Sequence, residues 1–357
     1  LKFVCVSQGE IHRVVTLSSS GTTGRPKRLY FTGEDQELTL DFFHVGMSTL
    51  VVPGDRVLIL LPVETPGGVG DLLATALGRL GATSVRHGLV RDLVETLDVM
   101  VRERVNSLVG VPSQVLALAR YRDESGRRVP VKLKSALLTT DHVPPAIVAA
   151  VEAAWGCTVY NHYGMTEMGL GGGVECQARR GYHLREADLY SEIVDPETGQ
   201  PLPEGEEGEV VFTTLTRRGM PLIRYRTGDL SRFLPEPCPC GTALKTMAAV
   251  RERVLGRVVV GEDLHLTIAD LDDALLPIEG VLGFSGSITG GGTRDCLNLE
   301  IQVAPGTRDP VSAALQGALD SVPALSQARS AGSLDVTVGL QESLLRSLTG
   351  PAKRKLL

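Results

Sequence analysis

A run of hydroxyl and glycine residues ends in a lysine near the start of the chain: residues 18–27 read SSSGTTGRPK. Glycines let backbone amides turn toward one anion, the hydroxyls add donors, and Lys27 adds a movable positive charge. Together these groups suit a polyphosphate. The run is not a Walker A loop, because no Ser or Thr follows the lysine to hold magnesium. Taken alone, a polar flexible turn explains it equally well.

Two further motifs could bind a ligand. Residues 160–167 read YNHYGMTE and follow an expected parallel strand, at the edge where open α/β sheets bind ligands. There Tyr163 could stack on a base, Thr166 could bond a phosphate and Glu167 could hold a divalent cation. In residues 224–230, RYRTGDL, Asp229 could accept bonds from two ribose hydroxyls. Taken singly, a capped strand end and an ordinary β-turn explain these motifs as well.

The elements that must position these motifs alternate in type. Short apolar runs predict buried strands, and the amphipathic stretches between them predict helices. Such alternation indicates a parallel sheet covered on both faces. The expected strands are 57–61, 107–111, 136–139 and 158–161, and the expected helices are 69–80, 92–104, 112–121 and 144–154.

The pattern changes after residue 175. Strands expected at 191–194 and 209–214 flank the turn signal DPETG, which indicates a β-hairpin. From residue 256 a strand–helix–strand–strand–helix–strand order, followed by a last helix, predicts a small ferredoxin-like α+β domain. Its expected elements are 258–260, 268–276, 281–288, 297–303, 310–322 and 333–339. The predicted fold class is α/β, with a large domain at 1–255 (an α/β core at 1–175 and a β-rich subdomain at 176–255) and a small domain at 256–357.

Composition narrows the class of protein. The 357 residues are 43% hydrophobic and 22% charged, which is typical of a soluble globular chain and excludes disorder. A net charge of −6 argues against a nucleic-acid partner, and no apolar run reaches the ~18 residues of a membrane helix. Without a visible leader, we expect a cytoplasmic protein. Because the chain starts at Leu1, shortly before the first motif, we expect part of the native N-terminus to be missing.

In their residue sequences and in their order along the chain, the three motifs resemble those of the adenylate-forming superfamily. The variants SSGTTG, YGMTE and MPLIRYRTGD resemble its phenylacetate–CoA ligase-like branch, and the resemblance runs from about residue 16 to residue 257. It implies an AMP-forming ligase: a carboxylate attacks the α-phosphorus of ATP, pyrophosphate leaves, and the acyl group passes to CoA or a carrier thiol. The branch alone suggests an aryl acid, and it is compatible with a homodimer.

The resemblance also implies a role for each matching residue. Lys27 and the loop before it would hold the β- and γ-phosphates, Thr166 would contact the α-phosphate, and Glu167 would ligate Mg²⁺. Tyr163, next to Gly164, would pack on adenine, Asp141 would lie beside the base, and Asp229 and Arg257 would bind the ribose. Residues 169–173, GLGGG, would lie near the acyl pocket, although a mobile loop explains them equally well. The loop residues are Ser19, Ser20, Gly21, Thr22, Thr23 and Gly24.

The C-terminal region departs from the family pattern. Relatives have an acidic hinge after the Gly-Arg matched by Arg257, where this chain has three valines at 258–260. Relatives also end in a Gly-Lys, where this chain has Pro351, with Lys353 two residues further on. These departures leave two alternatives open: an enzyme that stops at the acyl-adenylate or uses a non-thiol acceptor, and a degenerate, non-catalytic nucleotide-binding homologue.

Four side chains could bind zinc. Cys176, His183, Cys238 and Cys240 make a complete tetrahedral Cys₃His set, closed to substrate. The spacing is not that of a standard finger, so reactive or buried thiols explain it as well. Relatives in the resembling branch carry similar Cys, His and Cys-x-Cys positions, which favours a structural zinc.

Overall fold

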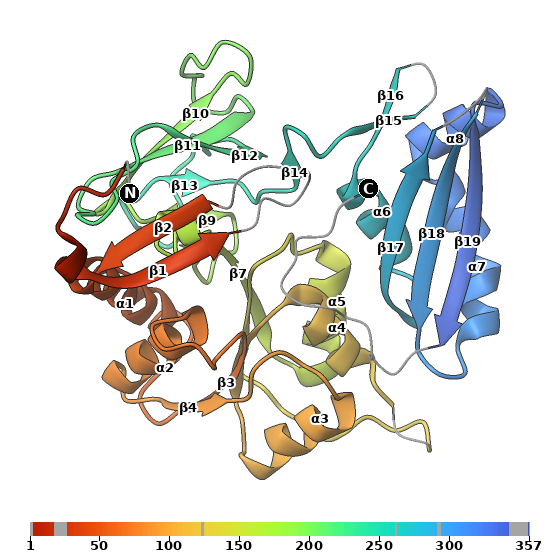
Figure 1. Cartoon of the computed structure of the whole chain (residues 1–357). Coiled ribbons are helices and arrows are strands. Elements are labelled where there is room, and N and C mark those ends of the chain that lie inside the picture. Colours follow the sequence, from red (N-terminus) through yellow and green to blue (C-terminus); the bar gives the residue numbers. More distant parts are fainter. Residues whose placement is uncertain are drawn as a thin grey trace. The chain divides into compact units, whose positions relative to one another are not determined.

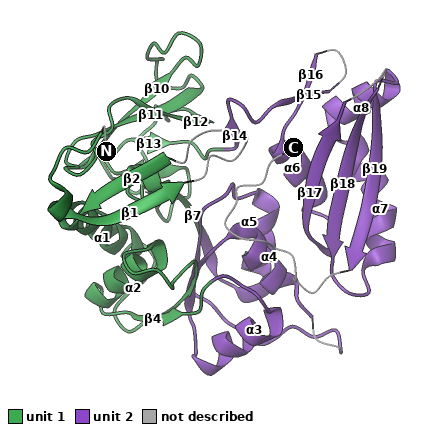
Figure 2. Ribbon diagram, in the orientation of Figure 1, with its two compact units in different colours: residues 1–88, 160–250 green, residues 89–159, 251–357 purple. Residues whose placement is uncertain are grey.

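The structure is a computed structural model that describes residues 3–17, 27–122, 125–260, 263–290, 294–342 and 356. The chain divides into two units, each built from two separate segments (Figure 2). Unit 1 comprises residues 1–88 and 160–250, and unit 2 comprises residues 89–159 and 251–357. The mixed α/β class predicted from the sequence is confirmed (Figure 1).

Unit 1 begins with an antiparallel hairpin followed by a parallel strand pair (Figure 1). In the hairpin, β1 pairs with β2 and places Leu17 opposite Lys27, so the lysine stands at the first residue of its strand. Strands β3 and β4 then pair in parallel through the connecting helix α2. The elements are η1 (Gln8–Glu10), β1 (Ile11–Leu17), β2 (Lys27–Thr32), α1 (Gly33–Met47), β3 (Arg56–Leu60), α2 (Val69–Arg79) and β4 (Thr83–Arg86).

A capping box fixes the start of α1. The Thr32 side chain accepts a hydrogen bond from the Asp35 backbone N–H, and Asp35 accepts one in return from the Thr32 backbone. The same carboxylate accepts bonds from the backbone N–H groups of Arg218 and Gly219, at 2.8 and 2.9 Å. Asp35, itself 3% exposed, therefore ties the start of α1 to the turn that precedes β12.

The second segment of unit 1 is mostly antiparallel. Strands β7, β8, β9 and β13 are neighbours in that order, and β10, β11 and β12 form a second sheet. The pairing of β10 with β11 confirms the expected hairpin. The elements are β7 (Thr158–Tyr163), η2 (Thr166–Met168), β8 (Gly173–Glu175), β9 (Tyr182–Leu184), β10 (Leu189–Val194), β11 (Gly208–Thr214), β12 (Tyr225–Ser231) and β13 (Thr246–Met247).

The first segment of unit 2 confirms the expected alternation. Strands β5 and β6 pair in parallel, and all their residues are buried. Helix α5 starts at a proline and ends at Gly156, whose φ of +65° is the left-handed conformation typical of a helix end. The elements are α3 (Leu93–Arg102), β5 (Ser107–Gly110), α4 (Pro112–Arg120), β6 (Ser135–Leu138) and α5 (Pro145–Trp155). These bounds differ by one or two residues from those expected.

The second segment of unit 2 is the expected α+β region, with differences in detail. Strands β17, β18 and β19 form a three-stranded sheet, with β17–β18 antiparallel and β18–β19 parallel. Strand β15, expected as the first strand of the ferredoxin-like domain, is not part of this sheet. Its three β-branched residues pair with β16 in a separate two-stranded ribbon (Figure 1). The elements are β14 (Glu252–Arg253), β15 (Val258–Val260), β16 (Leu264–Leu266), α6 (Ile268–Leu275), β17 (Val281–Thr289), β18 (Asp295–Val303), α7 (Arg308–Asp320), α8 (Pro323–Ser330) and β19 (Leu334–Glu342). Helix α8 begins at a proline directly after the expected end of its predecessor.

Two contacts join the segments of unit 2. The side chain of Arg120, at the end of α4, donates hydrogen bonds to the backbone carbonyls of Leu276 and Val281. Burial lowers the pKa of Arg120 to about 10. The last expected helix, with Pro351 and Lys353, lies outside the described residues. In the part of the chain that the structure describes, no helix is both long and apolar enough to cross a bilayer.

Candidate functional site

Three polar side chains meet at one point of unit 1. The Lys27 ammonium, at the start of β2, lies 3.2 Å from Oε1 of Glu167 and donates a hydrogen bond to the Tyr225 hydroxyl. The Tyr225 hydroxyl in turn lies 3.0 Å from the same Glu167 oxygen. Burial lowers the pKa of Lys27, but the Tyr225 hydrogen bond and the Glu167 charge outweigh it, and the net shift is upward. The lysine therefore stays protonated at neutral pH.

Backbone shape fixes the segment that carries Thr166 and Glu167. These residues form η2, and a Cβ added to Gly164 would lie 2.4 Å from the carbonyl oxygen of Leu170, so a larger residue cannot take this place. Gly169 and Leu170 have φ of +73° and +71°. A left-handed leucine is strained, and such strain gathers at functional sites.

The side chains of Arg217 and Thr39 donate hydrogen bonds to backbone carbonyls of this segment. Arg217 donates to the backbone carbonyl of Glu167, and its guanidinium lies 5.1 Å above the ring of Phe31. Thr39, from α1, donates to the carbonyl of Gly169 at 2.8 Å. Burial lowers the pKa of Arg217 to about 10, which still leaves it charged at neutral pH. The sequence motifs contain neither Arg217 nor Thr39, and neither was predicted as a site residue.

Tyr163 and Asp229 are brought together in the core of unit 1. The Tyr163 hydroxyl donates to Oδ2 of Asp229 at 3.0 Å, and its ring stacks on Tyr182 with centroids 5.6 Å apart. Tyr163 is 7% exposed and Asp229 is 1% exposed. Burial, and then the Asp229 charge, raise the pKa of Tyr163 well above its usual value. A hydrogen bond therefore joins the motif expected to bind adenine to the motif expected to bind ribose.

The remaining predicted residues fall into two groups. Asp141 and Arg257 belong to unit 2, where Asp141 accepts a bond from the His142 backbone and Arg257 pairs with Glu252 at 2.9 Å. Thr140, beside Asp141, has a strained φ of +79°. The phosphate-loop residues Ser19, Ser20, Gly21, Thr22, Thr23 and Gly24 lie outside the described residues.

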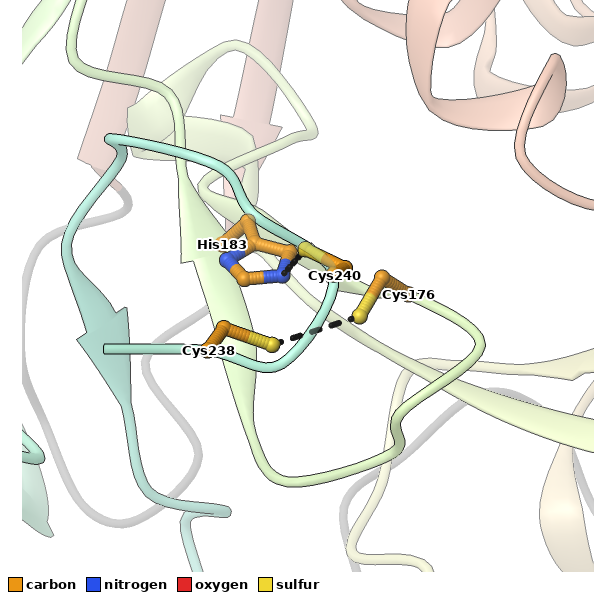
Figure 3. A group of neighbouring side chains, drawn as sticks. All are labelled: Cys176, His183, Cys238 and Cys240. Atoms are coloured by element: carbon orange, nitrogen blue, oxygen red, sulfur yellow. Dashed lines mark hydrogen bonds between the residues drawn. The ribbon is translucent and has the colours of Figure 1, made fainter. Parts of the chain in front are cut away.

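The four predicted zinc ligands form one cluster (Figure 3). Cys176 follows β8, His183 lies in β9, and Cys238 and Cys240 lie in the loop between β12 and β13. Their ligand atoms are all within 4.8 Å of one another. Sγ of Cys176 is 3.6 Å from Sγ of Cys238, and Sγ of Cys240 is 3.4 Å from Nε2 of His183. All six cysteines of the chain are described, and none forms a disulfide.

The cluster's chemistry fits a zinc ion. Zn–S bonds of about 2.3 Å place tetrahedral sulfur ligands about 3.8 Å apart, close to the observed spacing. Nδ1 of His183 lies 3.3 Å from the hydroxyl of Thr246, which leaves Nε2 facing the thiols. Without a metal, burial raises the pKa of Cys176 to about 11, so this thiol is neutral.

Comparison with known proteins identifies the family of this chain. The family model of the AMP-binding enzymes matches residues 12–215. The chain belongs to the AMP-binding enzyme family. A phenylacetate-coenzyme A ligase of Thermus thermophilus is 32% identical over 311 residues, which cover 84% of this chain and 67% of that enzyme. The enzyme of the same name from Escherichia coli is 32% identical over 250 residues, which cover 67% of this chain and 54% of that enzyme.

Solved structures show the same fold. A 2-hydroxyisobutyryl-CoA ligase in the postadenylation state superposes with a TM-score of 0.78 at 21% identity, over 99% of this chain and 75% of that one. An amide bond synthetase from Marinactinospora thermotolerans superposes with a TM-score of 0.65 at 19% identity, over 97% and 68%. The family model and the 32%-identical phenylacetate-coenzyme A ligases confirm the predicted adenylate-forming superfamily and its phenylacetate–CoA ligase-like branch. This AMP-binding enzyme spans between about half and two thirds of the length of the phenylacetate-coenzyme A ligases that it matches.

Proposed function

We propose that this AMP-binding enzyme uses ATP and Mg²⁺ to adenylate a carboxylic acid and then passes the acyl group to CoA or a carrier thiol. The observation that carries the proposal is the convergence of Lys27, Tyr225 and Glu167 beside Thr166. A cation, a carboxylate and a hydroxyl at one point suit in-line phosphoryl chemistry, which depends on positioning and charge neutralisation more than on covalent catalysis.

In the proposed reaction a carboxylate oxygen of the acid attacks the α-phosphorus of ATP. The bond from that phosphorus to the bridging oxygen breaks, and pyrophosphate leaves. Lys27 neutralises the charge that develops on the leaving group, and Thr166 orients the α-phosphate. The thiolate of the acceptor then attacks the acyl carbonyl, and AMP leaves with the carboxylate oxygen it received.

The Glu167 carboxylate fits the magnesium role. Mg²⁺ in nucleotide sites uses one or two carboxylates together with phosphate oxygens, and the Glu167 side chain is 12% exposed. When bound, the ion would offset phosphate charge. Lys27 and Tyr225 both contact Oε1 of Glu167, and these contacts orient the carboxylate.

The proposal assigns a structural role to zinc. Cys176, His183, Cys238 and Cys240 would hold the ion and join the start of the β8–β9 turn to the loop after β12. A closed Cys₃His set leaves no position for substrate, so the ion would stabilise the subdomain rather than take part in the reaction.

We also propose ligand contacts for the remaining motif residues, a substrate class and a domain organisation. Tyr163 packs near adenine, Asp229 and Arg257 contact ribose, Asp141 lies beside the base, and the phosphate loop at 19–24 holds the β- and γ-phosphates. The branch favours an aryl acid. Residues 1–255 and 256–357 act as functional domains of a cytoplasmic, homodimeric enzyme.

The deciding experiment is acid-dependent exchange of labelled pyrophosphate into ATP by the full chain, across aryl and short aliphatic acids, with and without Mg²⁺. Exchange that needs both an acid and Mg²⁺ supports adenylation. No exchange from a folded, zinc-loaded chain contradicts it. With a responding acid, AMP release that depends on CoA supports the thiol acceptor, and release independent of any thiol contradicts it.

A further inference from the structure

A hollow in unit 1 extends from Thr166, beside the proposed point of adenylation. Its empty volume is about 260 Å³, a figure that includes space open to solvent. Most of its lining is apolar or glycine. The lining residues are Arg13, Val15, Phe31, Gln36, Thr39, Gly67, Leu72, Thr166, Gly169 and Leu170.

Arg13 is a charged residue in an otherwise aliphatic row of half-buried positions on β1. The inward positions of β1 alternate as Ile11, Arg13, Val15 and Leu17, and each is half-buried. Three of the four are aliphatic, and two of these, Val15 and Leu17, pack against the core of unit 1. The arginine interrupts that pattern at one of the two β1 positions that line the hollow, Arg13 and Val15.

Among the described residues of unit 1, no carboxylate forms an ion pair with Arg13. In the described part of the chain, Arg13 makes one long hydrogen bond, from Nη1 to the carbonyl of Pro66 at 3.5 Å, and no ion pair. Asp71 is its electrostatic neighbour, but that carboxylate already binds Arg86 at 2.9 Å and the Gly67 backbone N–H at 2.8 Å. Burial lowers the pKa of Arg13, although the group stays charged at neutral pH.

A second donor stands beside Arg13. Nε2 of Gln36 bonds the carbonyl of Gly67 at 3.3 Å, and a Cβ built on Gly67 would lie 2.4 Å from that nitrogen and 3.3 Å from Nη1 of Arg13. The two side chains therefore flank the same residue. A guanidinium and an amide side by side in an otherwise apolar lining form a binding point for an anionic oxygen.

We infer that the acid activated here carries a second anionic group, a carboxylate, at the end remote from the reacting carboxyl. Arg13 binds that second carboxylate with support from Gln36, while the reacting carboxyl lies at Thr166. This inference rests on the proposed adenylation at that site and names its substrate class.

The test compares matched acids that differ only in the second charge: succinate with butyrate, and terephthalate with 4-methylbenzoate. Pyrophosphate exchange gives KM for each acid, and calorimetric titration of the same acids gives binding without catalysis. The variants are Arg13→Met, which keeps length but removes charge, and Arg13→Lys, which restores charge without the planar fork. Arg28→Met, at an exposed arginine of β2, is the control.

We expect the charged member of a pair to have a KM about 10-fold lower than its neutral match. Arg13→Met should raise that KM about 10- to 100-fold and leave the neutral acids unchanged, Arg13→Lys should recover part of the loss, and Arg28→Met should have no effect. Equal KM values within both pairs, unaltered by Arg13→Met, would overturn the inference and leave adenylation standing. If no acid supports exchange, the proposed adenylation fails, and titration then tests the binding part alone: Arg13-dependent binding of the diacids supports Arg13 as the binding point of the second carboxylate, and no such binding overturns the inference as well.

Discussion

Nζ of Lys27 lies 3.2 Å from Oε1 of Glu167, although the two residues are 140 positions apart in the chain. The lysine opens a strand of the first hairpin, and the glutamate lies in the short helical turn after β7. Tyr225, from a third part of the chain, contacts both. The proposed reaction depends on this meeting of three elements.

Replacing Glu167 with Gln should reduce Mg²⁺-dependent pyrophosphate exchange about 100- to 1,000-fold, because the amide keeps the shape but removes the charge that would bind the ion. The exchange rate over a range of Mg²⁺ concentrations measures the effect. Glu206→Gln, in an exposed loop, should match the parent chain. An exchange rate for Glu167→Gln equal to that of Glu206→Gln would remove this carboxylate from the mechanism.

Replacing Arg217 with Met should lower kcat for exchange about 10-fold and change KM for ATP little. Arg217 acts as a positioning residue, through the carbonyl of Glu167, so its loss loosens the η2 segment without removing a substrate contact. Arg217→Lys should keep part of the activity. The neighbouring Arg218, 58% exposed in an ion pair with Glu34, provides the control Arg218→Met. Equal kcat values for Arg217→Met and Arg218→Met would show that the Glu167 carbonyl needs no support from Arg217.

Replacing Tyr163 with Phe should lower the free energy of unfolding by about 1–3 kcal/mol, because the buried Asp229 carboxylate loses its hydroxyl donor. Urea denaturation measures this change. The same variant should raise KM for ATP, since Asp229 is then less firmly placed. Tyr190→Phe, at a residue 57% exposed, should leave the midpoint where it is. An unchanged midpoint for Tyr163→Phe would show that the hydrogen bond adds nothing to stability.

Elemental analysis should find about one zinc per chain, and Cys238→Ser should abolish it and lower Tm, because a Cys₃His site needs all its ligands. A chelator should lower the Tm of the parent chain in the same way. Cys5, an exposed cysteine away from the cluster, provides the control Cys5→Ser, which should retain the metal. Full zinc content in Cys238→Ser would contradict the assigned ligand set.

Replacing Arg120 with Met should lower the free energy of unfolding by about 1–3 kcal/mol, because the carbonyls of Leu276 and Val281 lose their donor. Limited proteolysis should then release the 251–357 segment sooner. Arg102→Met, on an exposed side chain of α3, is the control. Equal cleavage rates in the two variants would mean that Arg120 does not hold this segment.

Much of the local structure follows directly from residue order. The buried strand β3 and the amphipathic helix α2 follow from hydrophobic periodicity, and α5 from a proline at its start and a glycine at its end. The period-2 pattern of β1 also marks Arg13 as unusual, once its partner strand is known. Helix α1 was not predicted, because its apolar residues are not concentrated on one face and its start depends on the capping box of Thr32.

By itself, the sequence determined the family, through the wording of three motifs, and the donor types of the Cys₃His set. Residue identities are sufficient for both conclusions, because a motif is defined by consecutive residue types and a metal-ligand set by the chemical types of its side chains. Only the tertiary structure decided that Tyr225 bridges Lys27 and Glu167, that Arg217 supports Glu167 from behind, and that Arg13 lines the hollow beside Thr166. These relationships join residues from distant elements, and side-chain convergence of that kind depends on how the elements pack, which spacing along the chain does not encode locally.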